Sequence, residues 1–467
     1  MAGAWQHQDE AVEWAMGRGS APALLHLGMG CGKTRIAIEI MLRVLREREQ
    51  LLALVGCPKA VIAAWQKQGS LWAPDVRVVP IVGSTPAKKL QVIQQATADR
   101  SPLILVGNYE SISRLPILSK LSYDVICWDE IHRLKAHNGK ASKWAGKLVG
   151  ENPEAKVLGL SGTMLADKPL GAWGVYRASE WPECQTFGRS YTLFRARYAV
   201  ENPYIRGMVT GYRNQDEMAR KIAATTFYRR TEDVIKNLPG KTHTMVDCEL
   251  SAEEARVYRE LAKEFAAEVA GGTVTPKNAM ESTLRMLQAC GGFTRLDESS
   301  EFSSIVPVPA KAAAFGELLE DIEISEPIVV FARFRKDLDA VIAQATSSGR
   351  RVSELSGRQN QLAEWQAGET DVLVTQIASG GIGIDLTRSS LCVFYSVGYS
   401  LSEYLQAVAR LHRPGQERST RFLHLVATIR GGTTADGMVY QSLTEKRDVI
   451  DGIIDCFRGG RAVAAAH

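Results

Sequence analysis

Short apolar runs alternate along the chain with amphipathic stretches of helical length. The first series of runs comprises Ala23–Leu27, Leu52–Gly56, Leu103–Gly107, Val125–Trp128 and Lys156–Leu160. A second series comprises Pro327–Ala332, Val352–Leu355, Asp371–Thr375, Leu391–Ser396 and Arg421–Ala427. Continuous apolar runs separated by helical stretches are typical of parallel sheets covered by helices on both faces. The pattern therefore predicts an α/β fold with two parallel-sheet domains in tandem.

The segment between the two series follows a different pattern. From about Leu170 to Asn237 it is rich in Arg and aromatic residues and predicts helices. Ser251–Ala270 and Ser282–Cys290 also predict helices, and Ser251 with Glu254 has the spacing of a capping box. Glu298–Pro309 is rich in Glu, Ser and Pro and predicts a surface loop.

These elements suggest two domains. The first comprises residues 1–236, with a helical insertion at about 170–225. The second comprises residues 237–467, with a helical segment at about 251–295 and a last helix at about 434–457. At roughly 150 residues per domain, 467 residues suit two large domains or three smaller ones.

Composition excludes several classes of protein. The 45% hydrophobic and 23% charged residues allow a sizeable core and exclude wholesale disorder. A net charge of +4 excludes a polycation, although a local basic groove remains possible. No apolar run approaches the roughly 18 residues of a membrane span, and Asp9 and Glu10 stand where a signal peptide would be apolar. The eight cysteines form no CxxC pair, which favours a reducing cytoplasm and argues against a structural metal site.

A glycine-rich segment follows the first apolar run and opens the amphipathic stretch Arg35–Arg46. It has the sequence Gly28-Met29-Gly30-Cys31-Gly32-Lys33-Thr34. In such a loop the backbone of Gly30, Cys31 and Gly32 would cradle phosphates. Lys33 would contact the β- and γ-phosphates of a nucleotide, and the Thr34 hydroxyl would bind Mg²⁺. The alternative is a glycine-rich turn that binds no ligand.

A pair of carboxylates ends a second apolar run. Asp129 and Glu130 follow Cys127-Trp128 and precede Ile131-His132. A carboxylate at this place can hold Mg²⁺, a role for Asp129, and its neighbour Glu130 can orient and deprotonate water. Alone the pair is a weak signal, because charged residues commonly end strands. Together with the glycine-rich loop, it indicates a nucleotide hydrolase.

The carboxylate pair continues as Asp129–His132 with Arg133-Leu134-Lys135. Further motifs along nearly the whole chain are Gln8, Cys57-Pro58-Lys59 with Trp65, Asn108–Glu110, Ser161–Thr163, Phe227–Val234 with Leu238–Lys241, Phe331–Phe334, Ser379–Leu386 and Gln406–Gln416. Together they resemble the motifs of superfamily 2 helicase-like ATPases of the SWI/SNF type, whose DEAH signature is similar to Asp129–His132.

The resemblance implies two RecA-like lobes and a set of site residues. Gln8 is expected to read adenine, and Gly383 and Asp385 to contribute to nucleotide binding from the second lobe. Arg410 and Arg413 are expected to act as arginine fingers on the γ-phosphate. If Gln406–Gln416 is helical, both arginines lie on one face of the helix.

The sequence also departs from the family pattern. The family usually has Asp-Glu at Leu27-Gly28, Ala at Ile131, Asn at Asp385, and Trp-Asn-Pro near Tyr399-Ser400-Leu401. Leu355–Gly368 is shorter than in the family.

The resemblance implies an ATP-dependent translocase on double-stranded DNA, with ATP and Mg²⁺ bound and the DNA backbone contacted without sequence readout. Two basic clusters agree with such a partner but also suit a solvated face. One comprises Arg133, Lys135, Lys140, Lys143 and Lys147. In the other, Arg189, Arg195, Arg197, Arg206 and Arg213 are interleaved with Phe187, Tyr191, Phe194, Tyr198 and Tyr204.

Three other functions remain open from the sequence. One is a strand-separating superfamily 2 helicase on DNA or RNA. Another is a binding module with an inactive ATPase fold, against which Lys33, Glu130 and Arg413 argue. The third is a P-loop signalling or biosynthetic ATPase, which would leave Gln406–Gln416 unexplained. We expect a bare motor in a prokaryotic or viral cytoplasm, with no membrane contact, whose targeting depends on an unknown protein partner if on any.

Overall fold

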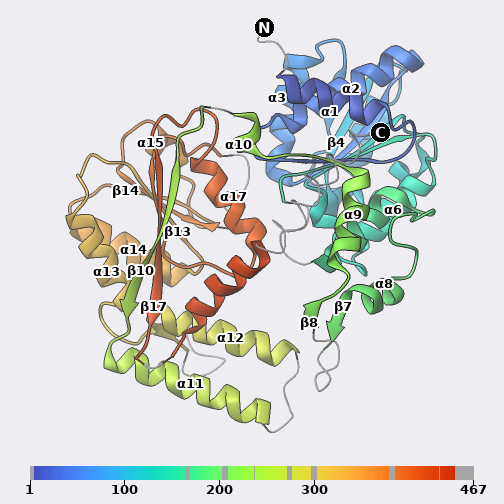
Figure 1. Ribbon diagram of the computed structural model, residues 1–467. Coiled ribbons are helices and arrows are strands. Elements are labelled where there is room, and N and C mark those ends of the chain that lie inside the picture. The colour runs from blue at the N-terminus through green and yellow to red at the C-terminus, as the bar shows by residue number, and fades with distance from the viewer. Residues whose placement is uncertain are drawn as a thin grey trace. The chain divides into compact units, whose positions relative to one another are not determined.

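The computed structural model describes residues 5–163, 169–201, 209–235, 237–270, 276–295, 302–377, 384–430 and 432–447. The described chain forms two compact units, one extending to residue 235 and the other comprising residues 237–447. Each unit has a parallel sheet with helices packed against it (Figure 1). This is the α/β architecture that the apolar runs predict.

A seven-stranded parallel sheet organises the first unit. Its strands, in order across the sheet, are β3 (Arg77–Pro80), β4 (Leu103–Asn108), β2 (Leu52–Cys57), β5 (Val125–Asp129), β6 (Lys156–Ser161), β1 (Ala23–Leu27) and β9 (Thr226–Arg229). The strands β1, β5 and β6 are buried along their whole length. Both sheet faces are therefore covered, as expected for continuous apolar strands.

Helices and a small hairpin complete the first unit. The helices are α1 (Gln6–Met16), α2 (Lys33–Arg48), α3 (Ile62–Trp72), α4 (Pro86–Ala96), α5 (Tyr109–Ile112), α6 (Lys140–Gly150), α7 (Ala172–Glu180), α8 (Tyr191–Tyr198), α9 (Gln215–Thr225) and α10 (Thr231–Val234). The antiparallel strands β7 (Ala199–Glu201) and β8 (Val209–Tyr212) form the hairpin. The prediction of helices throughout Leu170–Asn237 is therefore wrong in part, because this segment also contains β7, β8 and β9.

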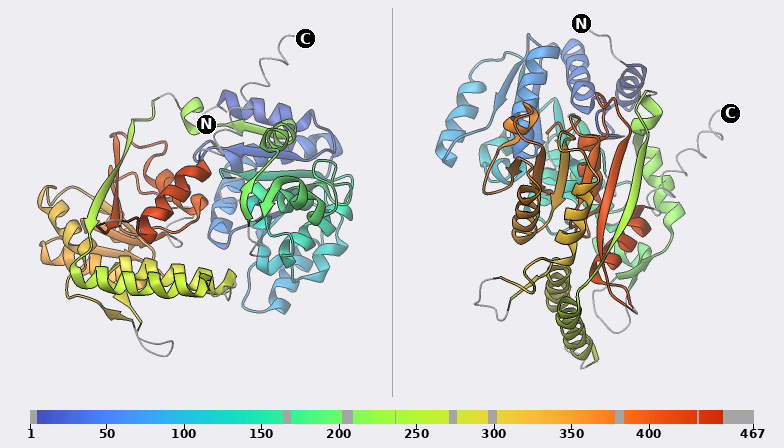
Figure 2. Two further views of the ribbon diagram at one scale, coloured as in Figure 1. Left: turned by 60° about the horizontal axis from the view of Figure 1, so that its bottom comes forward. Right: turned by 90° about the vertical axis from the view of Figure 1, so that its left-hand side faces the viewer.

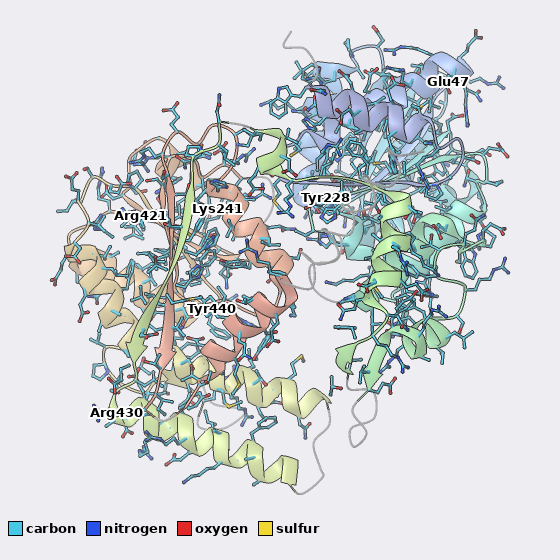
Figure 3. The ribbon with its side chains drawn as sticks, viewed as in Figure 1. Glu47, Tyr228, Lys241, Arg421, Arg430 and Tyr440 are labelled. Carbon is cyan, nitrogen blue, oxygen red and sulfur yellow. The ribbon has the colours of Figure 1, made fainter. Side chains whose placement is uncertain are left out.

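A six-stranded parallel sheet organises the second unit. Its strands, in order, are β10 (Lys241–Glu249), β17 (Thr420–Thr428), β16 (Leu391–Phe394), β13 (Ile328–Ala332), β15 (Val372–Gln376) and β14 (Val352–Leu355). The long neighbours β10 and β17 carry Lys241 and Arg421 near their starts (Figure 3). The sequence pattern did not reveal β10, because most of its side chains are exposed or half-buried.

The helices of the second unit are α11 (Ala252–Ala270), α12 (Pro276–Cys290), α13 (Ala310–Glu320), α14 (Arg335–Ser347), α15 (Leu362–Gln366), α17 (Leu401–Leu411) and a last helix at residues 435–447. The pair α11 and α12 extends beside the sheet as two adjacent helices (Figure 2). The predicted capping box is present, since the Ser251 N–H donates to Glu254 Oε2 at 3.0 Å and the Glu254 N–H donates to Ser251 Oγ at 3.3 Å. The short strands β11 (Phe293–Thr294) and β12 (Ser303–Ser304) pair at the predicted surface loop.

The seven cysteines of the described ranges are all buried and carry free thiols. Within those ranges no three His, Cys, Asp or Glu side chains gather as a metal cluster. No helix in the same part of the chain is long and apolar enough to cross a membrane.

A buried ion pair attaches the last helix to the second unit. Lys311 on α13 and Asp436 in the last helix are in contact, with side chains 1% and 3% exposed. Lys311 Nζ also donates to the Tyr395 carbonyl at 3.0 Å, and the Ala427 N–H donates to Asp436 Oδ2 at 3.2 Å. Burial is the largest influence and opposes charge on Lys311, but Asp436 together with Cys290 and Asp337 outweighs it, so the pKa of the lysine lies above its ordinary value.

Replacing Asp436 by Asn should therefore destabilise the second unit by about 3–5 kcal/mol, because the Lys311 ammonium would stay buried without its counter-charge. Urea unfolding of the full chain measures the loss. The double variant Lys311→Met with Asp436→Leu is the control, and it should recover most of the stability. A loss of less than about 1 kcal/mol in Asp436→Asn would contradict the assignment.

Candidate nucleotide-binding site

The glycine-rich loop joins β1 to α2, as the sequence predicts. Gly30 and Gly32 have φ angles of 81° and 78°, in the left-handed region that glycine adopts most readily. Gly32 caps α2, and its carbonyl accepts the Ile36 N–H at 3.0 Å. Lys33 and Thr34 are therefore the first two residues of the helix. Free N–H groups and a partial positive charge gather at this helix end.

Lys33 lies folded back against the loop. Its Nζ donates to the carbonyls of Leu27 at 3.0 Å and Gly28 at 3.3 Å. Gly162, which follows β6, is also close, because a Cβ built on it would lie 3.5 Å from this Nζ. The ammonium thus lies between the loop and the segment after β6. A bound phosphate would compete with the two carbonyls for it.

Two side chains of α1 hold the other side of the loop. The Cys31 carbonyl lies 2.8 Å from His7 Nε2 and accepts from Gln8 Nε2 at 3.4 Å. Gln8 Oε1 accepts the Trp5 N–H at 3.2 Å. A Cβ on Gly32 would displace the Gln8 amide from its present position, so the glycine allows Gln8 to lie against the loop. The structure therefore brings Gln8 to the loop, whereas its expected contact with adenine stays a prediction.

Asp129 ends β5 and is almost fully buried, with 5% of the residue exposed. Its Oδ2 accepts from Trp65 Nε1 at 2.8 Å, and its carbonyl accepts from the Tyr109 hydroxyl at 2.6 Å. Burial first, and then the neighbouring Glu130 charge, raise the pKa of Asp129 to about 6, against the opposing effects of Trp65 and Lys33. A divalent cation would supply the positive charge that this buried carboxylate lacks. Together with the hydroxyl of Thr34, the donor set fits Mg²⁺, which prefers oxygen ligands.

Glu130 begins a tight turn after β5, with a left-handed φ of 52°. Its Oε2 lies 3.2 Å from His132 Nδ1, and the same nitrogen lies 3.0 Å from Ser161 Oγ at the end of β6. Ser161 Oγ in turn accepts the Thr163 N–H at 3.0 Å. His132 Nδ1 is thus within hydrogen-bond distance of Ser161 Oγ and within ion-pair distance of the Glu130 carboxylate. The arrangement links the carboxylate pair to the Ser161–Thr163 motif and holds the Glu130 side chain.

His26 also belongs to this site, although the sequence analysis gave it no role. It lies buried on β1, with Nε2 3.1 Å from the Gly162 carbonyl and its ring edge-on to Tyr228 on β9 at 4.9 Å. Burial lowers its pKa to about 4, a shift that the nearby Lys33 charge reinforces. The available signal was one polar residue in an otherwise apolar strand, directly before the loop.

In the second unit, Arg413 lies beyond the end of α17, which finishes at Leu411. The expectation that Arg410 and Arg413 share one helix face is therefore wrong. The reason is Pro414, whose ring disfavours the helical conformation of the residue before it. Arg413 Nη1 donates to the Ile384 carbonyl at 3.2 Å and lies 3.8 Å from Asp385 Oδ2.

Further contacts hold these residues of the second unit together. The Leu386 N–H donates to the Arg410 carbonyl at 3.1 Å. The buried Gln416 amide donates to the Ser389 carbonyl at 2.9 Å and the Thr387 carbonyl at 3.3 Å. The structure thus brings Arg410, Arg413 and Asp385 to one place, while Gly383 lies outside the described residues. The Asp385 carboxylate has local partners, since its Oδ1 accepts the Thr387 N–H at 3.0 Å.

The two predicted basic clusters differ in the structure. Lys140, Lys143 and Lys147 are exposed on α6 at helical spacing, and Arg133 is exposed before it. The aromatic residues of the second cluster do not form a stacking surface, because Phe187, Tyr191, Phe194 and Tyr198 pack against one another at the core of the first unit. Two of its arginines form ion pairs, Arg197 with Glu217 at 2.7 Å and Arg195 with Glu201 at 3.0 Å. Tyr204 and Arg206 lie outside the described residues.

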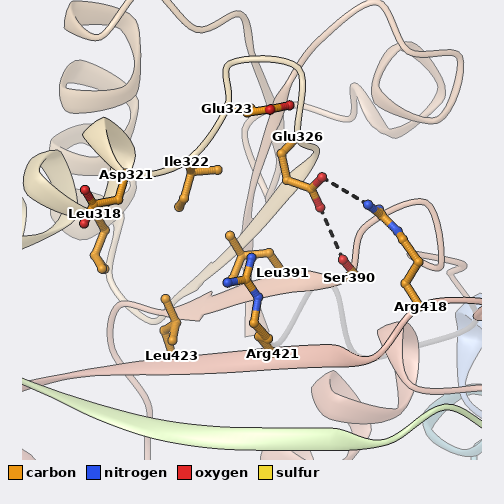
Figure 4. Close-up of a pocket in the computed structure, with 10 residues that line it drawn as sticks. All are labelled: Leu318, Asp321, Ile322, Glu323, Glu326, Ser390, Leu391, Arg418, Arg421 and Leu423. Atoms are coloured by element: carbon orange, nitrogen blue, oxygen red, sulfur yellow. Dashed lines mark hydrogen bonds and ion pairs between the residues drawn. The ribbon is translucent and has the colours of Figure 1, made fainter.

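A pocket of about 500 Å³ in the second unit lies away from these motifs (Figure 4). It lies where β16 and β17 start, at Leu391 and Arg421, whereas the arginines above follow the carboxyl end of β16. Glu326 lines it between Arg418, 3.0 Å away, and Ser390, 3.2 Å away. Because ligands of open α/β sheets bind at the carboxyl ends of the strands, this pocket is not the nucleotide site.

The fold and the loop define a P-loop protein with two parallel-sheet units. The SNF2-related domain matches residues 7–291, and the helicase conserved C-terminal domain matches residues 310–415. The first match alone covers more than half of the chain, and the chain belongs to the SNF2-related family. The resemblance drawn from the motifs is thereby confirmed.

Curated relatives and solved structures agree with this family. The chain is 25% identical over 438 residues to the putative ATP-dependent helicase/translocase YwqA of Bacillus subtilis, covering 91% of this chain and 46% of that protein. It is 23% identical over 461 residues to the uncharacterized ATP-dependent helicase MG018 of Mycoplasma genitalium, covering 95% and 42%. The chain thus spans less than half the length of these relatives. The Hef helicase domain of Pyrococcus furiosus shares the fold, with a TM-score of 0.52, 16% identity, and 93% and 97% of the two chains covered.

The buried His26 should make the first unit sensitive to acid. Its pKa is about 4 when folded against an ordinary value of 6.5, so the unfolded chain takes up this proton first as the pH falls. Stability should therefore decrease between pH 6.5 and 4, by about 2 kcal/mol from pH 7 to pH 5 through this residue alone. Urea unfolding at pH 7 and pH 5 measures the loss of stability. In His26→Gln this loss should be smaller than in the parent by about 2 kcal/mol. Equal losses in the two proteins would contradict the assignment.

Proposed function

We propose that this protein is an ATP-dependent motor that moves along double-stranded DNA. The observation that carries the proposal is the group of side chains at the carboxyl ends of β1, β5 and β6. There the Lys33 ammonium, the Asp129 and Glu130 carboxylates and the His132–Ser161 contact come together. This set of groups suits the binding and hydrolysis of a nucleoside triphosphate. The similarity to YwqA, a putative ATP-dependent helicase/translocase, supports the same activity.

Within this proposal, the loop binds the phosphates. The backbone N–H groups of Gly30, Cys31 and Gly32 surround them, and Lys33 exchanges its two carbonyl partners for phosphate oxygens. Gln8 would contact adenine. Thr34 and Asp129 would hold Mg²⁺, which when bound supplies positive charge to the phosphates.

Glu130 is the proposed general base. A carboxylate there can accept a proton from the attacking water. His132 and Ser161 would orient the carboxylate, since His132 Nδ1 lies 3.2 Å from Glu130 Oε2 and 3.0 Å from Ser161 Oγ.

The second unit would supply Arg410 and Arg413 as arginine fingers. The guanidinium group stays charged and donates bidentately, so it can stabilise charge that develops on the γ-phosphate. In the structure Arg413 is held by the Ile384 carbonyl and lies near Asp385. A triphosphate carries more negative charge than Asp385 and would compete for this arginine.

DNA would be held by its backbone. The exposed Lys140, Lys143 and Lys147 on α6, with Arg133, supply cations close in sequence to the carboxylate pair. Such contacts neutralise phosphates and read no bases, so binding should not depend on DNA sequence. The alternative activity is strand separation, which a displacement assay on forked DNA distinguishes from translocation.

ATP hydrolysis should be slow without nucleic acid and faster with it, more so with duplex than with single-stranded DNA. The reason is that catalysis would need groups from both units, whose closure DNA would favour. Steady-state ATPase rates at saturating ATP, with no nucleic acid, single-stranded DNA, duplex DNA or RNA, measure this. Glu130→Gln is the control, and it should still bind ATP but lose turnover, because an amide cannot accept the proton. Equal rates under all conditions would refute the proposed function.

Arg413→Ala should lower kcat by roughly 10³-fold, the scale of a lost arginine finger, and leave KM for ATP nearly unchanged. Rates with saturating duplex DNA measure both constants. Arg418→Ala is the matched control, because Arg418 lies in the same unit, is exposed and pairs with Glu326. It should change the rate by little more than twofold, as is typical of surface substitutions. A similarly small effect of Arg413→Ala would mean that this arginine does not act on the phosphate.

A further inference from the structure

The segment that follows β9 is attached to the phosphate-binding loop. The Gly28 N–H donates to the Arg229 carbonyl at 2.9 Å. Two residues later, Thr231 Oγ1 donates to the Met29 carbonyl at 3.1 Å, and the buried Cys31 thiol approaches the same hydroxyl at 3.9 Å. The loop residues Gly28, Met29 and Cys31 are thus all bound to residues 229–231.

The sequence at Gly28 permits this contact. A Cβ on Gly28 would lie 2.5 Å from the Thr231 nitrogen and 3.1 Å from its Cα, which are backbone atoms that cannot move aside cheaply. Any other residue at this position would push Thr231 away from the loop. The departure from the family pattern at Leu27-Gly28 therefore has a structural reason in this chain.

The same segment is also attached to α1. The Arg229 guanidinium forms an ion pair with Glu10, on the helix that carries His7. His7 in turn contacts the Cys31 carbonyl at 2.8 Å. The loop is therefore held by α1 on one side and by residues 229–231 on the other. Arg229 contacts both, since it is bonded to Gly28 of the loop and to Glu10 of α1.

We propose that Thr231 is a positioning residue that passes the state of the phosphate-binding loop to residues 229–235, directly before the second unit begins at Asn237. In the structure Lys33 Nζ donates to the Gly28 carbonyl, and a phosphate would draw it away. The Gly28 and Met29 peptide groups then change their surroundings, and both are bonded to residues 229–231. A rearrangement of the loop must either break these bonds or carry the segment with it. The inference rests on the proposed function only in that a nucleoside triphosphate binds the loop.

Amide hydrogen exchange on the full chain tests the inference directly. It compares residues 229–235 with and without a non-hydrolysable ATP analogue and Mg²⁺, and so needs neither turnover nor DNA. In the parent, the analogue should change exchange in this segment by fivefold or more. Thr231→Val removes the hydroxyl at nearly constant shape and should abolish the change, whereas Thr231→Ser keeps the hydroxyl and should retain it. Thr192→Val, an exposed threonine on α8, is the matched control and should behave as the parent.

Duplex affinity supplies a second measurement. The ratio of duplex Kd values without and with the analogue reports the coupling between the two ligands. It should fall toward one in Thr231→Val and stay at the parent value in Thr231→Ser. A merely structural role would weaken both affinities and leave the ratio unchanged, and that result would overturn the inference.

The two proposals fail in different ways. If the parent binds the analogue but residues 229–235 exchange as before, the inference is wrong and the proposed function stands. If the parent does not bind the analogue at all, both are wrong. Both of these outcomes are measured on the parent protein. The inference can therefore still be overturned if Thr231→Val fails to fold.

Discussion

Parallel pairing of β5, β6 and β1 is the constraint on which the nucleotide site depends. Their register places Asp129 beside Leu160 and Ser161 beside His26, so residues more than 100 positions apart end at the same edge of the sheet. Parallel strands also require crossover connections, which carry the helices to both faces. The glycine-rich loop follows from the same constraint, because it is the connection by which β1 enters its helix. Side chains from three separate motifs therefore meet without any of them being close in sequence.

Gathering these groups in a buried place has an electrostatic cost. Burial and a second carboxylate raise the pKa of Asp129, and burial with a nearby ammonium lowers that of His26. Each group is thus held in surroundings that oppose its charged form. A nucleotide with its cation supplies the charges that are missing, since phosphates suit Lys33 and a divalent ion suits Asp129. The ligands that the site is proposed to bind would therefore supply charges opposite to those of the protein groups, which fits a site organised for binding.

The sequence allowed most of the fold to be predicted, because strands buried on both faces leave continuous apolar runs. The ten predicted runs correspond to β1, β2, β4, β5 and β6 and to β13 through β17. The sequence pattern did not reveal the strands β3, β9 and β10. These strands lie at sheet edges, where part of each strand is exposed or half-buried, so they carry no continuous apolar run. The prediction that Arg410 and Arg413 share one helix face failed because Pro414 follows Arg413 and disfavours the helical conformation there. The mixture of Arg and aromatic residues in one segment also suggested a DNA-binding surface, but the aromatic rings pack at the core while Arg195 and Arg197 pair with carboxylates.

Of the edge strands that the sequence pattern did not reveal, β9 is the one that joins the site to the segment leading to the second unit. β9 pairs with β1 from Leu24 to Leu27, so the loop starts where β9 ends. A strand at this position cannot move without moving the loop, since Gly28 continues the pairing through its bond to Arg229. Only a residue without a side chain allows Thr231 to come this close. The close contact between Gly28 and Thr231 therefore depends on the glycine, and the sequence of the loop alone does not show it, because Thr231 is about 200 residues away in the chain.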